Sequence, residues 1–298
     1  MPSTPLSSAP GRCVYLRLVM LPLASIIAAC GGSSTGPSDV AAPGATAAIN
    51  YSAIGASDAN GVGGSVPCIP FTVCDEGTGY VPVLVRQLRA SREVTVLNLG
   101  MPAAVLGPTV EAIARQLGRE VSGNFLDRQM PFVARESTLV TVFAGVNDAN
   151  IIGEAIEHGA GGSDIPAYIA TQARAFGTEY DALIAGIRGR APHSFIIVMN
   201  VPNVAAMPFA QKYPVEHRRV LQSIAGALSR ESNRQAGNGI AVLDMMCDPG
   251  TYSPSHFSGD GFHPNDAGYA NIARRLEAVV NSGSASAASS CGMMTAVS

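Results

Sequence analysis

The chain has 298 residues, and 47% of them are hydrophobic, which is enough to build one domain with a sizeable core. Its formal net charge of −3 provides no basic field, so we expect no nucleic-acid partner. No apolar run in the sequence is long enough to span a bilayer.

The N-terminal 29 residues have the composition of an export signal. Arg12 and Arg17 precede the apolar stretch LVMLPLASIIAAC, which ends in small residues and Cys30. Residues 27–30 resemble the lipobox of bacterial lipoproteins, whose cysteine is acylated and becomes the first mature residue. We therefore expect an exported protein anchored to a membrane surface through lipid on Cys30. A plain secretory signal, which would release the protein, or a buried helix is the alternative.

Residues 30–47 are rich in glycine, serine and alanine, which predicts a flexible tether. Four cysteines follow it in the mature chain, which is an even number in an oxidising compartment. Of the three possible connectivities we favour the local one, Cys68 with Cys74 and Cys247 with Cys291. No pair has the C-x-x-C spacing of a zinc site, so no metal centre is indicated.

Alternating strands and helices predict one α/β domain with a parallel sheet that helices cover on both faces. The strand candidates are short apolar runs rich in β-branched residues, at 48–54, 94–99, 138–144, 194–200 and 240–245. Segments with helical periodicity lie at 79–91, 107–119, 165–189, 216–236 and 265–280. Asp164 and Asn265 have the residue types of helix starts. The low-complexity tail, 282–298, is expected to be loose apart from any cystine at Cys291.

Open α/β sheets bind ligands beyond the carboxyl ends of their strands, so we expect the functional residues in the loops after the strands. The first of these loops is GASDANGVGGS, at residues 55–65. It lacks the lysine that a phosphate-binding P-loop requires, and its glycines do not follow the G-x-G-x-x-G spacing of a dinucleotide site. Phosphate binding is therefore not indicated.

Acyl transfer needs a nucleophile, a base, an orienting acid and donors for an oxyanion, and the same loops supply them. Ser57 ends the first strand. Asp260 and His263, three residues apart in DGFHPNDAGY, can share one tight turn. Gly100 after the second strand offers a backbone N–H, and Asn147 after the third offers a side-chain amide.

With these residues the sequence resembles the SGNH, or GDSL-type, hydrolases. Four sequence blocks match in order: IGASDANG, NLGMP, GVNDAN and DGFHPNDAGY. The resemblance spans residues 48 to 281 and implies a three-layer α/β/α domain with five parallel strands in the flavodoxin-like order 2-1-3-4-5. One departure is Ala56, where the family usually has aspartate. We expect this change to affect loop rigidity rather than catalysis.

The resemblance implies hydrolysis of a carboxylic ester, with Ser57 as nucleophile, His263 as base and Asp260 as the acid that orients it. The N–H groups of Ser57 and Gly100 and the amide of Asn147 would form the oxyanion hole. No cofactor or metal is required, and we expect a monomer.

Competing assignments remain for several of these residues. Asp58, Asp148 and Asp266 lie on loops at the same edge of the sheet as Asp260, although we expect Asp58 and Asp148 to brace loops. His256 is a rival base, but it has no aspartate three residues before it.

The substrate is open among lipid, short-chain and acetyl esters, because a fold does not choose its substrate. Val204, Met207 and Phe209 could wall an apolar acyl pocket, or they could simply cover the sheet. The alternative function is a surface lipoprotein that binds a glycan or a lipid without turnover.

Overall fold

The computed structural model describes residues 40–72 and 74–297. The predicted signal peptide, the lipidation candidate Cys30 and most of the predicted tether lie outside these residues.

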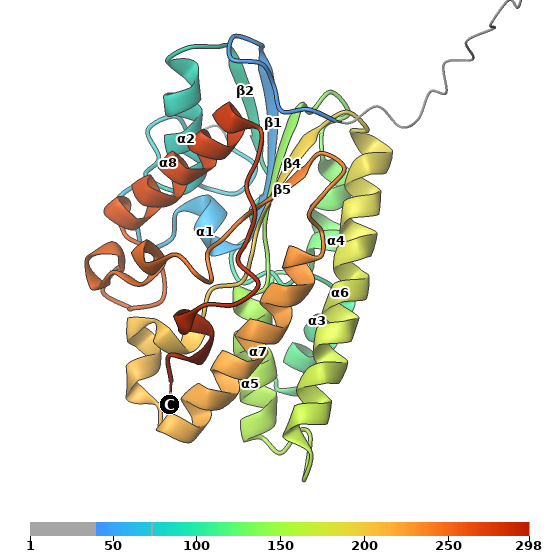
Figure 1. Cartoon of the computed structure of the whole chain (residues 1–298), viewed down its shortest axis with the longest axis vertical. Coiled ribbons are helices and arrows are strands. Elements are labelled where there is room, and N and C mark those ends of the chain that lie inside the picture. Colours follow the sequence, from blue (N-terminus) through green and yellow to red (C-terminus); the bar gives the residue numbers. More distant parts are fainter. Residues whose placement is uncertain (1–39, 73, 298) are drawn as a thin grey trace, which may run out of the picture. The chain divides into compact units, whose positions relative to one another are not determined.

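A single parallel sheet of five strands forms the centre of the domain, in the order β2-β1-β3-β4-β5 (Figure 1). This confirms the predicted fold class and strand order. The strands are β1 (Ile49–Gly55), β2 (Val94–Asn98), β3 (Leu139–Phe143), β4 (Phe195–Met199) and β5 (Ile240–Leu243). Every residue of β3 and β4 is buried, as expected for apolar strands covered on both faces.

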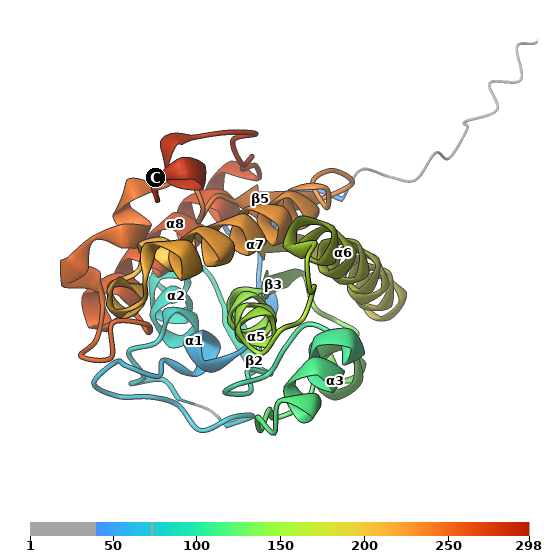
Figure 2. The same ribbon diagram turned by 90° about the horizontal axis from the view of Figure 1, so that it is seen from below.

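Helices pack on both faces of the sheet (Figure 1, Figure 2). One face carries α2 (Tyr80–Arg89) and α8 (Asp266–Ser282). The opposite face carries α3 (Pro108–Gln116), α5 (Val146–Glu157), α6 (Ile165–Arg190) and α7 (Val215–Asn233). Two single-turn helices, α1 (Ser57–Asn60) and α4 (Phe125–Arg128), lie in loops. Short 3₁₀ turns are η1 (Met130–Phe132), η2 (Val204–Ala206), η3 (Pro208–Lys212), η4 (Pro249–Tyr252), η5 (Pro254–His256) and η6 (Gly292–Thr295).

Helix α2 illustrates how the sequence builds these layers. Tyr80, Leu84 and Leu88 recur at a spacing of four, and all three are buried against the sheet. Burying one such leucine contributes about 1.5–3 kcal/mol to folding. Among the described residues, no helix combines the length and hydropathy that crossing a membrane would require.

The predicted helix starts are confirmed. The carboxylate of Asp164 accepts a hydrogen bond from the N–H of Ala167 at 3.0 Å, and the amide oxygen of Asn265 accepts one from Gly268 at 3.0 Å. Both are N-caps, of α6 and α8. The sequence did not predict α5, because GVNDAN was interpreted as a loop. In the structure Gly145, with φ of 105°, turns the chain directly into the helix.

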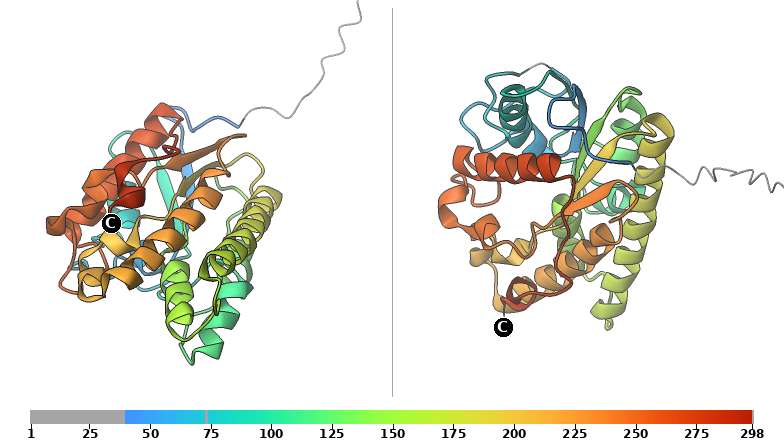
Figure 3. Two further views of the ribbon diagram at one scale, coloured as in Figure 1. Left: turned by 60° about the horizontal axis from the view of Figure 1, so that its bottom comes forward. Right: turned by 45° about the horizontal axis from the view of Figure 1, so that its top comes forward.

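The expectation of a loose C-terminal tail is wrong. Ala285 accepts a hydrogen bond from the N–H of Val242 on β5 at 3.2 Å, so the tail covers the edge of the sheet. Farther along, the N–H of Val297 donates to Gln222 of α7 at 2.9 Å. Figure 3 shows this segment, in dark red, running beside β5 and ending at α7. Hydrogen bonds of the backbone order this segment, although the side chains in its sequence did not indicate an ordered structure.

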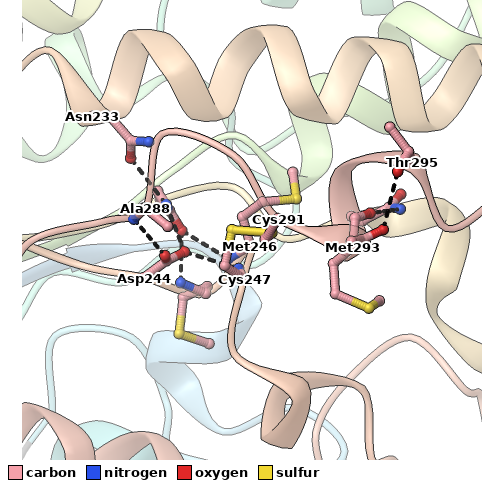
Figure 4. The surroundings of a disulfide bond; sticks show 12 residues. Asn233, Asp244, Met246, Cys247, Ala288, Cys291, Met293 and Thr295 are labelled. Atoms are coloured by element: carbon pink, nitrogen blue, oxygen red, sulfur yellow. Dashed lines mark hydrogen bonds between the residues drawn. A yellow bond between two sulfur atoms is a disulfide. The ribbon is translucent and has the colours of Figure 1, made fainter.

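Both predicted disulfides are present, Cys68–Cys74 and Cys247–Cys291. The second joins the tail to the loop after β5, and Asp244 reinforces the same junction (Figure 4). One carboxylate oxygen of Asp244 accepts from the N–H of Cys247 at 2.9 Å, and the other accepts from Ala288 at 2.9 Å. The tail is therefore held by a covalent bond and by the carboxylate of Asp244 together.

Candidate active site

Ser57 lies just beyond the carboxyl end of β1, as the first residue of α1, and its side chain is only 5% exposed. The side chain of Gln129 holds the last residue of this strand in place. Its amide oxygen accepts from the N–H of Gly55, and its amide nitrogen donates to the carbonyl of Gly55, both at 2.9 Å. Sequence reasoning missed Gln129. No motif marks it, and 74 residues separate it from Gly55.

Ser57, His263 and Asp260 form a continuous hydrogen-bonded line. Nε2 of His263 lies 2.9 Å from the hydroxyl oxygen of Ser57. Nδ1 of the same ring lies 2.6 Å from Oδ2 of Asp260. An acid that accepts from Nδ1–H leaves Nε2 free to take the serine proton. The structure thus brings together the three residues that the sequence analysis singled out.

Asp260 is held by more than His263. Its other oxygen, Oδ1, accepts from the hydroxyl of Ser258 and from the N–H groups of Phe262 and His263, at 2.8, 2.8 and 2.9 Å. Burial alone would raise the pKa of Asp260, but these bonds and the one from His263 outweigh it and hold the pKa well below its usual range. Asp260 is therefore an ionised carboxylate fixed in orientation.

The loop that carries His263 is clamped onto the loop that carries Ser57. The amide of Asn265 donates to the carbonyls of Ser255 and Phe257, at 2.9 and 3.0 Å. From α8, the hydroxyl of Tyr269 donates to the carbonyl of Val62 at 2.5 Å. Gly63 must be glycine here, since it has φ of 92° and a Cβ would come within 2.7 Å of the Cβ of His263. Two segments 206 residues apart are thus brought to hydrogen-bonding distance.

Gly100 lies where it was predicted, after β2 and against α1. A Cβ at this position would come within 2.6 Å of Ala59, so only glycine allows the two loops to approach. Its N–H, however, donates to Oδ1 of Asn98 at 3.0 Å. A substrate oxyanion would have to share this N–H or displace Asn98. Among the described residues, no hydrogen-bond acceptor faces the N–H of Ser57.

Asn147 lies at the start of α5, and 8% of it is exposed. One amide hydrogen binds the carbonyl of Ala104 at 2.9 Å, which leaves the second without a partner among the described residues. The neighbouring Asp148 is buried and accepts from the N–H of Leu106 at 3.0 Å. Burial raises the pKa of Asp148 to about 7. Asp148 therefore braces the loop after Gly100, as expected.

The rival residues are engaged elsewhere. Nδ1 of His256 lies 2.8 Å from the carbonyl of Gly250, and the carboxylate of Asp266 binds the N–H and the hydroxyl of Ser65, both at 2.7 Å. Within residues 40–72 and 74–297, no cluster of histidine, cysteine and acidic side chains is arranged to hold a metal ion.

The three candidate pocket residues differ in their positions. Val204 is fully buried in the core, where it covers the sheet. Met207 lines a cavity beside the site. The ring of Phe209 packs edge-on against Phe262, the neighbour of His263, with ring centres 4.9 Å apart.

Comparisons with known proteins agree with this fold. The model of the GDSL-like Lipase/Acylhydrolase family matches residues 53–270. A comparison with curated proteins found no match.

Solved structures with the same fold include the lipase Lip_vut3 from a goat rumen metagenome, with a TM-score of 0.53 and 18% identity over 77% of this chain and 96% of that one. An extracellular lipase from Streptomyces rimosus has a TM-score of 0.52 and 16% identity over 77% and 99%. Phospholipase A1 from Streptomyces albidoflavus has a TM-score of 0.50 and 21% identity over 78% and 99%.

Proposed function

Because the chain belongs to the GDSL-like lipase/acylhydrolase family and is a carboxylic ester hydrolase, we propose that it works through an acyl-enzyme on Ser57. The observation that carries this proposal is the hydrogen-bonded line from Ser57 through His263 to Asp260. No other serine or threonine hydroxyl among the described residues has a histidine nitrogen as a hydrogen-bond partner.

Acylation follows from these positions. The oxygen of Ser57 attacks the ester carbonyl while Nε2 of His263 takes its proton, and Asp260 stabilises the imidazolium that results. The C–O bond to the alcohol then breaks, and the alcohol leaves with the proton from His263. Water repeats the sequence on the acyl group, so an ester and one water yield an acid and an alcohol.

The oxyanion of each tetrahedral intermediate needs hydrogen-bond donors. We assign this role to the N–H of Ser57, the free amide hydrogen of Asn147 and the N–H of Gly100. Because the N–H of Gly100 already donates to Asn98, this third donor contributes only where the oxyanion shares that N–H or displaces Asn98.

Substitution of the nucleophile tests the proposal. Ser57→Ala should lower hydrolysis of p-nitrophenyl acetate, butyrate and decanoate by about 10³-fold or more with an unchanged circular dichroism spectrum. Ser255→Ala is the matched control, because this exposed serine lies on the same side of the domain and its hydroxyl bonds only to Ser253, while its backbone carbonyl, which accepts from Asn265, is kept in the variant. Near-normal turnover by Ser57→Ala would rule out the assignment, and the wild-type rates for the three esters define the acyl preference.

We also propose that Cys30, which lies outside the described residues, carries lipid and anchors the protein to a membrane. The sequence pattern before Cys30 supports this proposal. Mass spectrometry of the mature N-terminal peptide should find an acylated Cys30, whereas an unmodified terminus at another residue would make the protein a secreted one.

A further inference from the structure

An apolar cavity lies beside the hydrogen-bonded line of Ser57, His263 and Asp260. Neither Ser57 nor His263 is among its lining residues. Three of its lining residues are chain neighbours of the reacting groups: Asp58 follows Ser57, and Phe262 and Pro264 flank His263. The remaining walls come from the end of β3, the start of α5, the loops after β4 and β5 and the first turns of α8. The volume available to the centre of a water molecule inside this cavity is about 40 Å³, which is several times what one water needs.

The walls are unusually rich in polarisable groups. Phe143, Phe257 and Phe262 contribute aromatic rings, and Met207 and Met245 contribute thioethers. Neither lysine nor arginine is among the lining residues. Such walls attract an apolar group, and aromatic rings attract an organic cation.

Asp58 is the one acidic residue among those that line this cavity. Its carboxylate forms no salt bridge and accepts no hydrogen bond from another residue in the part of the chain that the structure describes. Burial raises the pKa of this carboxyl, and the nearby positive charge that His263 can carry opposes the rise. No other described residue donates a hydrogen bond to the Asp58 carboxylate, so the structure shows no contact by which this side chain would brace a loop.

The position of the cavity indicates which half of an ester it receives. The alcohol must leave from the side of His263, because Nε2 of His263 returns the proton to the alcohol oxygen. Of the oxyanion donors, Gly100 follows β2, and neither it nor its chain neighbours line the cavity, whereas Asn147 adjoins Val146, which does. Both chain neighbours of His263 are among the walls, against one of Asn147, and this favours the alcohol side of the site.

We propose that this cavity binds the alcohol half of the ester and that this alcohol carries a compact cationic group, such as a quaternary ammonium. The inference rests on the proposed function. A quaternary ammonium has no N–H to satisfy, so it suits walls with few acceptors. Its charge is met by the aromatic rings and by the single carboxylate of Asp58.

Two acetate esters of nearly the same shape test the inference. Acetylcholine and 3,3-dimethylbutyl acetate differ in the charge of the alcohol, because a carbon replaces the nitrogen. We expect kcat/KM to be about tenfold higher or more for acetylcholine, which is the size of a desolvated cation–aromatic interaction.

The ratio of the two rates should fall toward one in Asp58→Asn. Asp266→Asn is the matched control, since this acid lies near the same loops but binds Ser65 and does not line the cavity. Its ratio should equal that of the wild type. Because the readout is a ratio for two substrates, a general loss of activity does not imitate the effect.

A binding measurement separates this inference from the proposed function. Tetramethylammonium should bind Ser57→Ala in calorimetry and should bind the Asp58→Asn, Ser57→Ala double variant at least about tenfold more weakly. Equal hydrolysis of both acetates, or no binding of tetramethylammonium, would overturn the cavity assignment and leave the hydrolase intact. Binding without hydrolysis of any ester, p-nitrophenyl acetate included, would overturn the proposed function instead.

Discussion

The imidazole of His263 owes its orientation to Asp260 and to a turn of four residues. Asp260 binds the ring nitrogen with one oxygen and the backbone of its own turn with the other. The D-x-x-H spacing is local, which is why the sequence alone predicted this pair. Gln129 could not be predicted in the same way, because its contact with Gly55 exists only after the chain has folded.

Asp260→Asn should disable the site without disturbing the loop. The amide oxygen can still accept from Phe262 and His263, but an amide N–H now faces Nδ1 and selects the wrong tautomer. We expect kcat for p-nitrophenyl acetate to fall by about 10³- to 10⁴-fold. The same exchange at Asp266 should leave kcat nearly unchanged. A variant at Asp260 with more than about a tenth of wild-type kcat would show that another acid orients His263.

Among the elements, the buried strands were the most predictable and the loops after them the least. Runs such as SFIIVMN are β-branched, apolar and short, and β4 occupies most of that run. Helix α5 escaped prediction because its first turn, with Asn147 and Asp148, has the composition of a loop and its N-cap is a glycine. The tail escaped because its order comes from backbone bonds and from Asp244.

The Cys247–Cys291 disulfide should be the more stabilising of the two. It closes a separation of 44 residues, against 6 for Cys68–Cys74. In the chain-entropy model the longer loop contributes about 4 kcal/mol to the free energy of unfolding and the shorter about 2 kcal/mol.

Denaturant unfolding of the two serine double variants, Cys247→Ser with Cys291→Ser and Cys68→Ser with Cys74→Ser, compares the bonds directly. The larger loss should belong to the first variant. Equal losses, or the reverse order, would mean that the hydrogen bonds of the tail already hold it without the disulfide.

At the scale of the whole molecule, the chain enters the domain far from the candidate site. Val40 lies against Gly239, just before β5, and the carbonyl of Gly44 accepts from Arg92, just before β2, at 3.3 Å. These are the amino ends of parallel strands, whereas Ser57 lies at the carboxyl end of β1. The described part of the chain therefore begins at the edge of the sheet opposite to the site.

The pH dependence of the free energy of unfolding should reflect the buried Asp148. Its pKa of about 7 in the folded protein exceeds the ordinary value of 3.8, so the folded state holds the proton more tightly. The contribution of such a group is complete below its unfolded pKa and is lost as the pH rises through about 7. The free energy of unfolding of the wild type should therefore decline between about pH 4 and pH 8. The part of this decline that comes from Asp148 should be absent in Asp148→Asn.

Chemical denaturation across this pH range measures the difference between the wild type and the variant. The amide oxygen of the variant can still accept from Leu106, so the fold should persist. Glu120→Gln, which changes an exposed acid, is the control and should run parallel to the wild type. A difference that does not vary with pH would contradict the raised pKa of Asp148.

The central claim is that His263, oriented by Asp260, activates Ser57 as a nucleophile. Labelling with diisopropyl fluorophosphate, followed by peptide mapping in a mass spectrometer, tests it most directly. One phosphoryl adduct per chain should form on the peptide that contains Ser57, disappear in Ser57→Ala, and form at least about 10²-fold more slowly in His263→Ala. An adduct on another residue, or labelling of Ser57 at an undiminished rate without His263, would contradict it.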